Sequence, residues 1–163
     1  MENYEIERKF LIAFPDLAKL SRQATRRLEM VQTYLTAAEG ESRRVRKITE
    51  AGKVTYWKTE KKRISDIRRL ETETEISEDT YCTLLREADR ERRPIEKVRY
   101  CVPNGHQTLE IDIFPFWEDK AFLEVELSDE QEAIALPPEF HVLREVTGDK
   151  RYTNAALAKA LPE

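Results

Sequence analysis

Cysteine, histidine and glycine are all scarce in this chain of 163 residues, which contains only 2, 2 and 4 of them. Cys82 and Cys101 form no CxxC pair and suggest no disulfide framework, so a reducing cytoplasm is the simplest interpretation. His106 and His141 are too few to predict a zinc site built on histidine, and we expect both at the surface or in packing. The sequence also lacks a P-loop, a dinucleotide fingerprint and a Ser-His-Asp triad, so none of these chemistries is predicted.

Long apolar runs and low-complexity linkers are absent as well. A membrane-spanning helix needs about 20 consecutive apolar residues, and no run approaches that length. The N-terminal sequence Met-Glu-Asn-Tyr-Glu is acidic, whereas a signal peptide begins with basic residues followed by apolar ones. We therefore expect a soluble, cytoplasmic protein without a membrane partner, folded as one domain over residues 1–163.

Charged residues, in contrast, are abundant: they make up 37% of the chain, with 28 Lys and Arg against 32 Asp and Glu. The two signs are intermixed and the formal net charge is -4. A nucleic-acid-binding protein is usually basic or carries a dense basic stripe, so no nucleic-acid partner is expected. Hydrophobic residues make up 40% and recur periodically, unlike in a disordered chain. The excess of charge therefore predicts a structured functional surface.

The pattern of turns and apolar residues predicts an α+β fold dominated by an antiparallel sheet. Asn104-Gly105 is a strong hairpin signal, because both residues tolerate positive φ. Pro15-Asp16 suits the first turn of a helix and Ser77 suits an N-cap. Many antiparallel strands with short turns favour a closed barrel, which has no exposed edges. Strands are expected near 3–12, 28–36, 42–49, 53–60, 68–76, 95–102, 107–114 and 122–128, and helices near 15–27, 78–90 and 152–160.

In the first of these strands, the charged side chains lie on one face, because residues at i, i+2 and i+4 point the same way. Glu5, Glu7 and Lys9 share this face, while Ile6 and Phe10 share the other. The segment alone is also compatible with a helix, in which Glu5 and Lys9 would form an ordinary surface pair.

The same alternation recurs in later strands, and it separates acidic strands from basic ones. A solvated outer face is the common explanation for such alternation. However, grouped carboxylates repel each other, and a solvated face gains nothing from them. We therefore favour a barrel with a charged lumen and an apolar outer surface covered by the helices. The strands in question carry Glu71, Glu73 and Glu75; Glu110 and Asp112; Glu124 and Glu126; Arg44 and Arg46; Lys97 and Arg99; and Lys58 after Trp57.

Glu5-Ile6-Glu7-Arg8-Lys9 matches the Glu-x-Glu-x-Lys hallmark of the CYTH, or triphosphate tunnel metalloenzyme, family, which this sequence resembles. The family implies an eight-stranded antiparallel tunnel that hydrolyses or rearranges triphosphate compounds with Mg²⁺ or Mn²⁺. The short chain is most similar to small prokaryotic members that cleave inorganic triphosphate. The resemblance continues in order with Gln32-Thr-Tyr34-Leu35, Arg44-Val-Arg46, Lys58-Thr59, Glu71 to Glu75, Glu96-Lys97-Val-Arg99-Tyr100, Glu110-Ile-Asp112, Glu124-Val-Glu126-Leu127 and Gly148 to Asn154.

The resemblance also implies roles for individual residues. A basic set would bind phosphate oxygens: Lys9, Arg44, Arg46, Lys58 and Arg99, with Lys97 beside them. Asp112, Glu124 and Glu126 would bind one metal ion, and Glu5, Glu7 and Glu73 would bind another or orient the attacking water. Lys9, Glu5, Glu7 and Glu73 are the expected catalytic residues. Lys150 or Arg151 would bring a cation to the tunnel mouth. Which of Glu71, Glu73 and Glu75 is functional stays open.

These residue types suit phosphoryl transfer, which needs mainly positioning and neutralisation of charge. Arg binds phosphate oxygens with two parallel hydrogen bonds, and Mg²⁺ joins carboxylates to the substrate. The leading hypothesis is in-line attack by water on a terminal phosphorus of a small-molecule triphosphate. Thiamine triphosphatase, nucleoside triphosphatase and adenylate cyclase activities remain alternatives, as does a non-catalytic module that binds polyphosphate or nucleotide. The sequence leaves a homodimer and the number of metal ions open.

Overall fold

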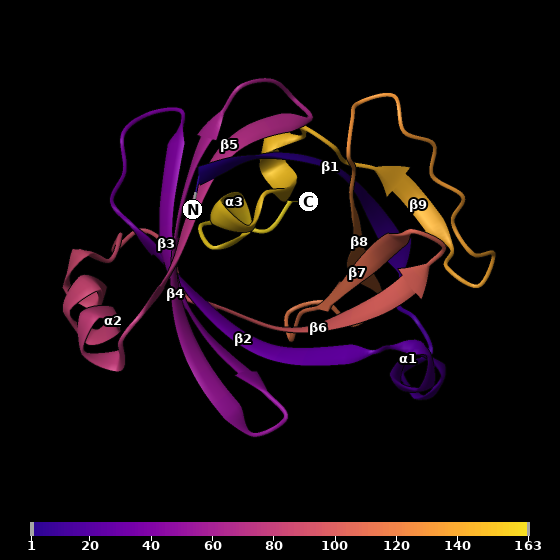
Figure 1. Cartoon of the computed structure of the whole chain (residues 1–163), viewed down its shortest axis with the longest axis horizontal. Coiled ribbons are helices and arrows are strands. Elements are labelled where there is room, and N and C mark those ends of the chain that lie inside the picture. Colours follow the sequence, from indigo (N-terminus) through magenta and orange to yellow (C-terminus); the bar gives the residue numbers. More distant parts are fainter. Residues whose placement is uncertain (1, 163) are drawn as a thin grey trace.

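The structure is a computed structural model that describes residues 2–162, and in this part of the chain nine strands form one antiparallel sheet (Figure 1). Most of the strand positions predicted from the sequence are confirmed. The elements are β1 (Glu2–Ala13), α1 (Leu17–Gln23), β2 (Arg26–Leu35), β3 (Glu41–Glu50), β4 (Lys53–Arg63), β5 (Arg68–Ile76), α2 (Glu78–Leu84), η1 (Leu85–Glu87), β6 (Ile95–Asn104), β7 (Gln107–Ile113), β8 (Lys120–Glu126), β9 (Val142–Glu145), η2 (Lys150–Tyr152) and α3 (Asn154–Leu157).

Strand β1 closes the sheet into a barrel. The strands follow the order β5-β4-β3-β2-β6-β7-β8-β1-β9, with an additional pairing between β5 and β1. The first half of β1, Glu2–Ile6, pairs with β5, and the second half, Glu7–Ala13, pairs with β8. Eight strands therefore form the closed ring seen in Figure 1, which confirms the predicted barrel. Strand β9, which pairs with Phe10–Ile12, was not predicted.

The helices begin where the sequence predicts but are shorter than expected. Asp16 caps α1 by accepting a hydrogen bond from the Lys19 backbone N–H, and Ser77 caps α2 in the same way. The predicted helix over 152–160 was wrong in its extent. Thr153 is extended (φ -72°, ψ 150°), so it separates the 3-10 turn η2 from α3 and caps α3. None of the helices within residues 2–162 is long and apolar enough to cross a membrane.

The main hydrophobic core lies on the outer face of the barrel, as predicted. Leu109, Ile111, Leu123 and Val125 are all fully buried there, against Leu20 of α1 and the segment that follows β8. A smaller cluster joins the opposite side of the barrel to α2. Because the apolar side chains alternate along each strand, their neighbours must point into the barrel.

The barrel interior is not charged throughout, which corrects the expectation of a uniformly polar lumen. Leu28, Met30 and Ile48 pack with Cys101 inside one part of the barrel. Elsewhere η2 and α3 pack Tyr152 and Leu157 against an aromatic cluster that includes Phe122, and Figure 1 shows α3 within the ring of strands. The charged region lies between these two apolar fillings.

Candidate active site

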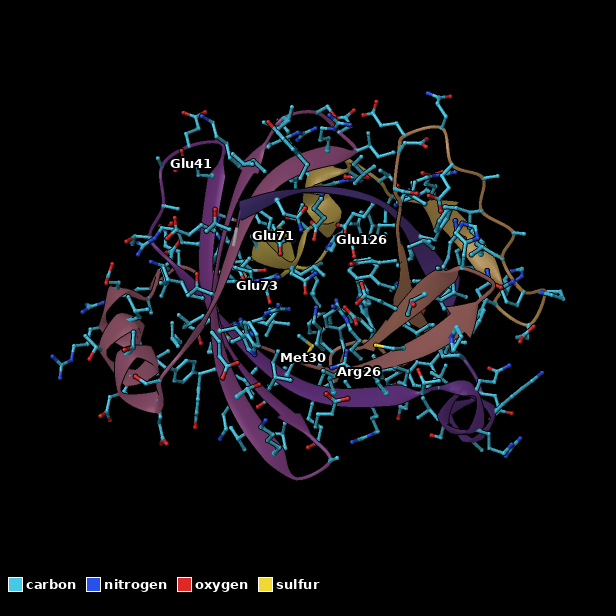
Figure 2. The ribbon with its side chains drawn as sticks, viewed as in Figure 1. Arg26, Met30, Glu41, Glu71, Glu73 and Glu126 are labelled. Carbon is cyan, nitrogen blue, oxygen red and sulfur yellow. The ribbon has the colours of Figure 1, made fainter. Side chains whose placement is uncertain are left out.

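Charged side chains from seven of the eight barrel strands line one cavity of about 730 Å³, to which β2 contributes Tyr34. Figure 2 shows Glu71, Glu73 and Glu126 inside the ring of strands and Glu41 near its rim. The structure thus brings together most of the residues predicted from the sequence. The predicted residues that line this cavity are Glu5, Glu7, Lys9, Arg44, Arg46, Glu73, Lys97, Arg99, Glu124, Glu126 and Lys150.

Four glutamates on β1, β7 and β8 form the acidic wall of the cavity. Glu7 lies opposite Glu126, and Glu110 lies opposite Glu124 in the strand register. Like charges directly opposite each other are destabilising in a sheet. Burial, together with the charges of Glu124 and Glu5, raises the pKa of Glu7 to about 7. Burial and neighbouring carboxylates also raise the pKa of Glu110 and that of Glu126. The acidic wall therefore favours the binding of cations.

Arg44 and Arg46 on β3, with Lys97 and Arg99 on β6, form the cationic wall. Burial and the charges of Arg44 and Arg99 lower the pKa of Arg46 to about 10. Within the described residues, the buried Nε atoms of Arg44 and Arg46 have no hydrogen-bond partner, although Arg46 Nη2 lies 3.3 Å from Glu73 Oε1. Clustered cations with unused donors are the arrangement that a polyanion stabilises.

Lys9 links the acidic wall to the C-terminal segment. Its Nζ lies 3.3 Å from Glu124 Oε1 and donates a hydrogen bond to the Tyr152 backbone oxygen at 3.2 Å. The ammonium also lies 4.6 Å from the centre of the Phe122 ring, and the Lys9 backbone N–H donates to Thr147 Oγ1. The position of this cation is therefore fixed before a ligand binds.

Asp112, which the resemblance predicts as a metal ligand, is not among the residues that line the cavity. It is fully buried and accepts hydrogen bonds from Arg99 Nε at 2.8 Å and Arg99 Nη2 at 2.9 Å. Lys97 Nζ lies 2.8 Å from Asp112 Oδ2, the oxygen that also accepts from Arg99 Nη2. Burial opposes its ionisation, but the charges of Arg99 and Lys97 outweigh burial and hold the pKa of Asp112 well below its usual range. Asp112 thus orients two cations, while Glu110 of the same strand lines the cavity.

Lys58 also lies away from the cavity. The hairpin between β3 and β4 turns at Ala51-Gly52, where both residues have positive φ, and this turn sets the register. Lys58 pairs with Val45, which is buried on the outer face, and its Nζ lies 2.9 Å from Glu60 Oε1. Lys61, which has the opposite orientation, lines the cavity instead. The alternation along β4, counted from this turn, is the signal that could have identified Lys61.

The acidic strand β5 contributes Glu71 and Glu73 to the cavity, whereas Glu75 is exposed and lies outside it. Lys61 Nζ lies 2.9 Å from Glu5 Oε1 and 3.7 Å from Glu71 Oε2. Burial and hydrogen bonds to Glu5 and Glu73 raise the pKa of Glu71 to about 8. Of the three acids among which the sequence left the choice open, Glu71 and Glu73 thus both line the cavity.

At the mouth of the cavity, only one of the two predicted cations faces inward. Lys150 lines the cavity. Arg151 is exposed, and its Nη2 lies 2.8 Å from Asp149 Oδ2. Arg63 and Arg69, which the sequence left without a role, are further cations of the lining, and Arg69 Nη1 lies 3.5 Å from Glu7 Oε1.

Comparison with known proteins places this architecture in a family. The family model of the CYTH domain matches residues 3–148, and the chain therefore belongs to the CYTH domain family. It is 38% identical over 164 residues to an inorganic triphosphatase of Nitrosomonas europaea, covering 97% of this chain and 99% of that protein. It is 34% identical over 157 residues to an inorganic triphosphatase of Acetivibrio thermocellus, covering 95% and 93%.

Solved structures show the same fold. The crystal structure of an inorganic triphosphatase, 32% identical, matches 98% of this chain and 97% of its own length with a TM-score of 0.58. A protein of Pyrococcus horikoshii matches 78% of this chain and 80% of its own length, with a TM-score of 0.61 and 23% identity. The second match supports the fold alone.

Membership of this tunnel metalloenzyme family implies a divalent metal ion, and the acidic wall fits one. Its carboxylates are hard oxygen ligands, and the repulsion that raises the pKa of Glu7 and that of Glu126 would be relieved by a cation. Among residues 2–162, no group of three or more acidic, His or Cys side chains is already arranged as a complete metal site. Mg²⁺ typically takes only one or two carboxylates, with waters and substrate phosphates as its other ligands, so the donor set is sufficient.

Proposed function

We propose that this protein hydrolyses inorganic triphosphate to pyrophosphate and phosphate, with Mg²⁺ or Mn²⁺ as its metal ion. The observation that carries the proposal is the cationic wall facing the acidic wall within one closed barrel. A polyanion alone would be repelled by the acidic wall, and a metal ion alone would be repelled by the cationic wall. A triphosphate with its metal ion satisfies both walls at once.

The cationic wall would bind the phosphate chain. The guanidinium groups of Arg44 and Arg46 are charged at neutral pH and can donate to two oxygens at a time. Arg99 already donates to Asp112 and Glu110, and it adds positive charge beside them. Lys9 and Lys97 add compact charges that hydrogen bonds already hold in place. Preorganised donors of this kind stabilise the charge that develops during phosphoryl transfer, because little reorganisation is needed as the reaction proceeds.

The acidic wall would hold the metal ion, chiefly through Glu126, Glu110 and Glu124. When bound, the metal ion would neutralise phosphate charge and polarise a water molecule. Glu7 is our candidate for accepting the proton of the attacking water, because its carboxylate is less closely paired than that of Glu5 on the same strand. Glu5 lies 2.9 Å from Lys61, whereas the cation nearest Glu7 is Arg69 at 3.5 Å. Metal binding and proton transfer would then both be performed by carboxylates of the barrel wall.

The preference for inorganic triphosphate is supported by the two relatives named inorganic triphosphatase, which this chain matches over nearly its whole length. The decisive experiment supplies tripolyphosphate, ATP and thiamine triphosphate separately, with Mg²⁺ or Mn²⁺, and measures both phosphate and cyclic AMP. We expect the fastest phosphate release from tripolyphosphate. Faster turnover of ATP or thiamine triphosphate would show that this compound, and not inorganic triphosphate, is the preferred substrate. Tight binding without phosphate release from any of the three compounds would exclude catalysis.

A further inference from the structure

The side chain of Asn154 joins the C-terminal segment to the interior of the barrel. Asn154 is the first residue of α3, is 8% exposed and lines the cavity. Its Oδ1 accepts a hydrogen bond from Gln32 Nε2 at 3.1 Å and another from Lys97 Nζ at 3.1 Å. Gln32 is fully buried and Lys97 is nearly so. A single amide oxygen thus connects three elements, β2, β6 and α3.

The orientation of this amide follows from the chemistry of its neighbours. Burial lowers the pKa of Lys97 to about 7, whereas the charge of Asp112, 2.8 Å away, favours the ammonium form. That ammonium has three donors and no acceptor, so the atom of Asn154 that faces it is the oxygen. A flipped amide would place two donors against each other. The –NH₂ group of Asn154 must therefore point away from Lys97.

Asn154 supplies the second of two acceptors that fix the Lys97 ammonium. The first is Asp112 Oδ2, at 2.8 Å, but that same oxygen also accepts from Arg99 Nη2 at 2.9 Å. Asp112 thus holds Lys97 through a shared oxygen, which leaves the direction of the flexible side chain underdetermined. With Asn154 in place, two of the three N–H donors are used and one remains for a ligand in the cavity.

We propose that Asn154 is a positioning residue for Lys97, holding the ammonium so that its remaining N–H meets a phosphate group of the substrate. The proposal rests on the proposed function, because it assigns Lys97 a phosphate of the bound triphosphate. Asn154 lies in the segment after residue 148, beyond the part of the chain that the family model matches. The C-terminal segment thereby contributes to substrate binding through a residue on another strand.

The test is a double-mutant cycle on ligand binding. Affinity for the non-hydrolysable bis-imidotriphosphate is measured calorimetrically with Mg²⁺ for the wild type, Asn154→Ala, Lys97→Met and the double variant. We expect Asn154→Ala to weaken binding at least about five-fold when Lys97 is present and less than about two-fold when it is Met, since residues in contact couple in such cycles. Asn154→Ser, which shortens the side chain beyond reach of Lys97, replaces the alanine variant if the latter fails to fold.

Thr153→Ala is the matched structural control. Thr153 caps α3 through the Ala156 backbone N–H, so its loss perturbs the same short helix without removing the contact with Lys97. Its effect on binding should be the same in both Lys97 backgrounds. Equal weakening by Asn154→Ala in both backgrounds would overturn the inference, because the effect would then come from α3 as a whole.

The outcomes also separate this inference from the proposed function. Coupled binding of the analogue without hydrolysis of tripolyphosphate by the wild type would support the role of Asn154 and reject the triphosphatase. Hydrolysis by the wild type without coupling between Asn154 and Lys97 would support the triphosphatase and reject the role of Asn154. Failure of the wild type to bind the analogue would reject both.

Discussion

Glu7 on β1 and Glu126 on β8 lie directly opposite each other in the barrel and share one cavity, although both are acidic. No cation of residues 2–162 lies within ion-pair distance of Glu126, and the one paired with Glu7 is 3.5 Å away. The pair is thus a local source of instability, which proteins commonly retain where a ligand relieves it. Glu126 should therefore lower the stability of the metal-free protein and raise its affinity for a metal ion.

Replacing Glu126 should stabilise the metal-free protein and impair the metal-bound one. Glu126→Gln removes one of two opposed charges, so we expect the free energy of unfolding in chelator to rise by roughly 0.2–1 kcal/mol, the scale of cross-strand pairs. The added stability that Mg²⁺ confers on the wild type should shrink, as linkage requires of a lost ligand. Urea denaturation with and without Mg²⁺ measures both effects, with Glu130→Gln on the exposed loop as control. A variant less stable than the wild type in chelator would contradict the expectation.

Lys9 should be essential for turnover. Its ammonium lies between Glu124, the Tyr152 carbonyl oxygen and the Phe122 ring, so no other side chain can replace it. We expect Lys9→Ala to lower kcat for tripolyphosphate at least about 100-fold, the scale of a lost preorganised stabiliser. Lys47→Ala, which removes an exposed charge from β3, should leave kcat within about two-fold, as is usual for surface substitutions. Near-normal turnover in Lys9→Ala would remove Lys9 from the site.

Removal of divalent metal ions should abolish phosphate release. EDTA is expected to stop turnover of tripolyphosphate because the acidic wall alone repels the substrate, and an excess of Mg²⁺ or Mn²⁺ should restore it. Initial rates in a titration of each metal ion provide the measurement. Full activity in metal-free buffer would show that turnover does not require a metal ion held by the carboxylates of the cavity.

Asp112 should contribute to the free energy of unfolding even when no metal ion is bound. Asp112→Asn removes the carboxylate that pairs with the buried Lys97 and leaves Arg99 with Glu110 at 3.1 Å and Glu124 at 3.9 Å. We therefore expect a loss of roughly 3–5 kcal/mol in the free energy of unfolding, even in chelator. Asp119→Asn, at a side chain that is 80% exposed, is the control. A variant of normal stability with weakened Mg²⁺ binding would instead make Asp112 a metal ligand.

The short turns between strands predicted the barrel, and the alternation of charge together with the family resemblance predicted most of its lining. The alternation is informative because side-chain direction has a strict period of two. The same rule makes the prediction sensitive to register. Lys58 and Lys61 differ by three positions and so face opposite sides, and only the turn at Ala51-Gly52 determines which one faces inward. The family resemblance predicted that Lys58 of this strand binds phosphate, but it contained no information on the geometry of the turn.

Depth within the barrel was the second property that the sequence did not reveal. Glu110 and Asp112 point into the same interior, yet Asp112 is fully buried under two cations while Glu110 lines the cavity. Position along the barrel axis depends on strand tilt and on what fills the interior. Leu28 and Met30 alternate with Glu29 in the sequence, a pattern that equally suits an apolar outer face, so their place inside the barrel became evident only from the pairing of β2 with β6.

Strand β1 gives the site an order of assembly. β1 is synthesised before the other strands of the barrel, but it pairs with β5 and with β8, and β8 is complete only at Glu126. Neither the Glu7–Glu126 pair nor the Lys9–Glu124 pair can exist in a nascent chain that stops short of β8. Contacts between such distant segments form late and slowly, because the intervening loop must first be closed. A nascent chain that ends before β8 therefore has no complete phosphate-binding cavity. The cavity can form only after β8 has been synthesised.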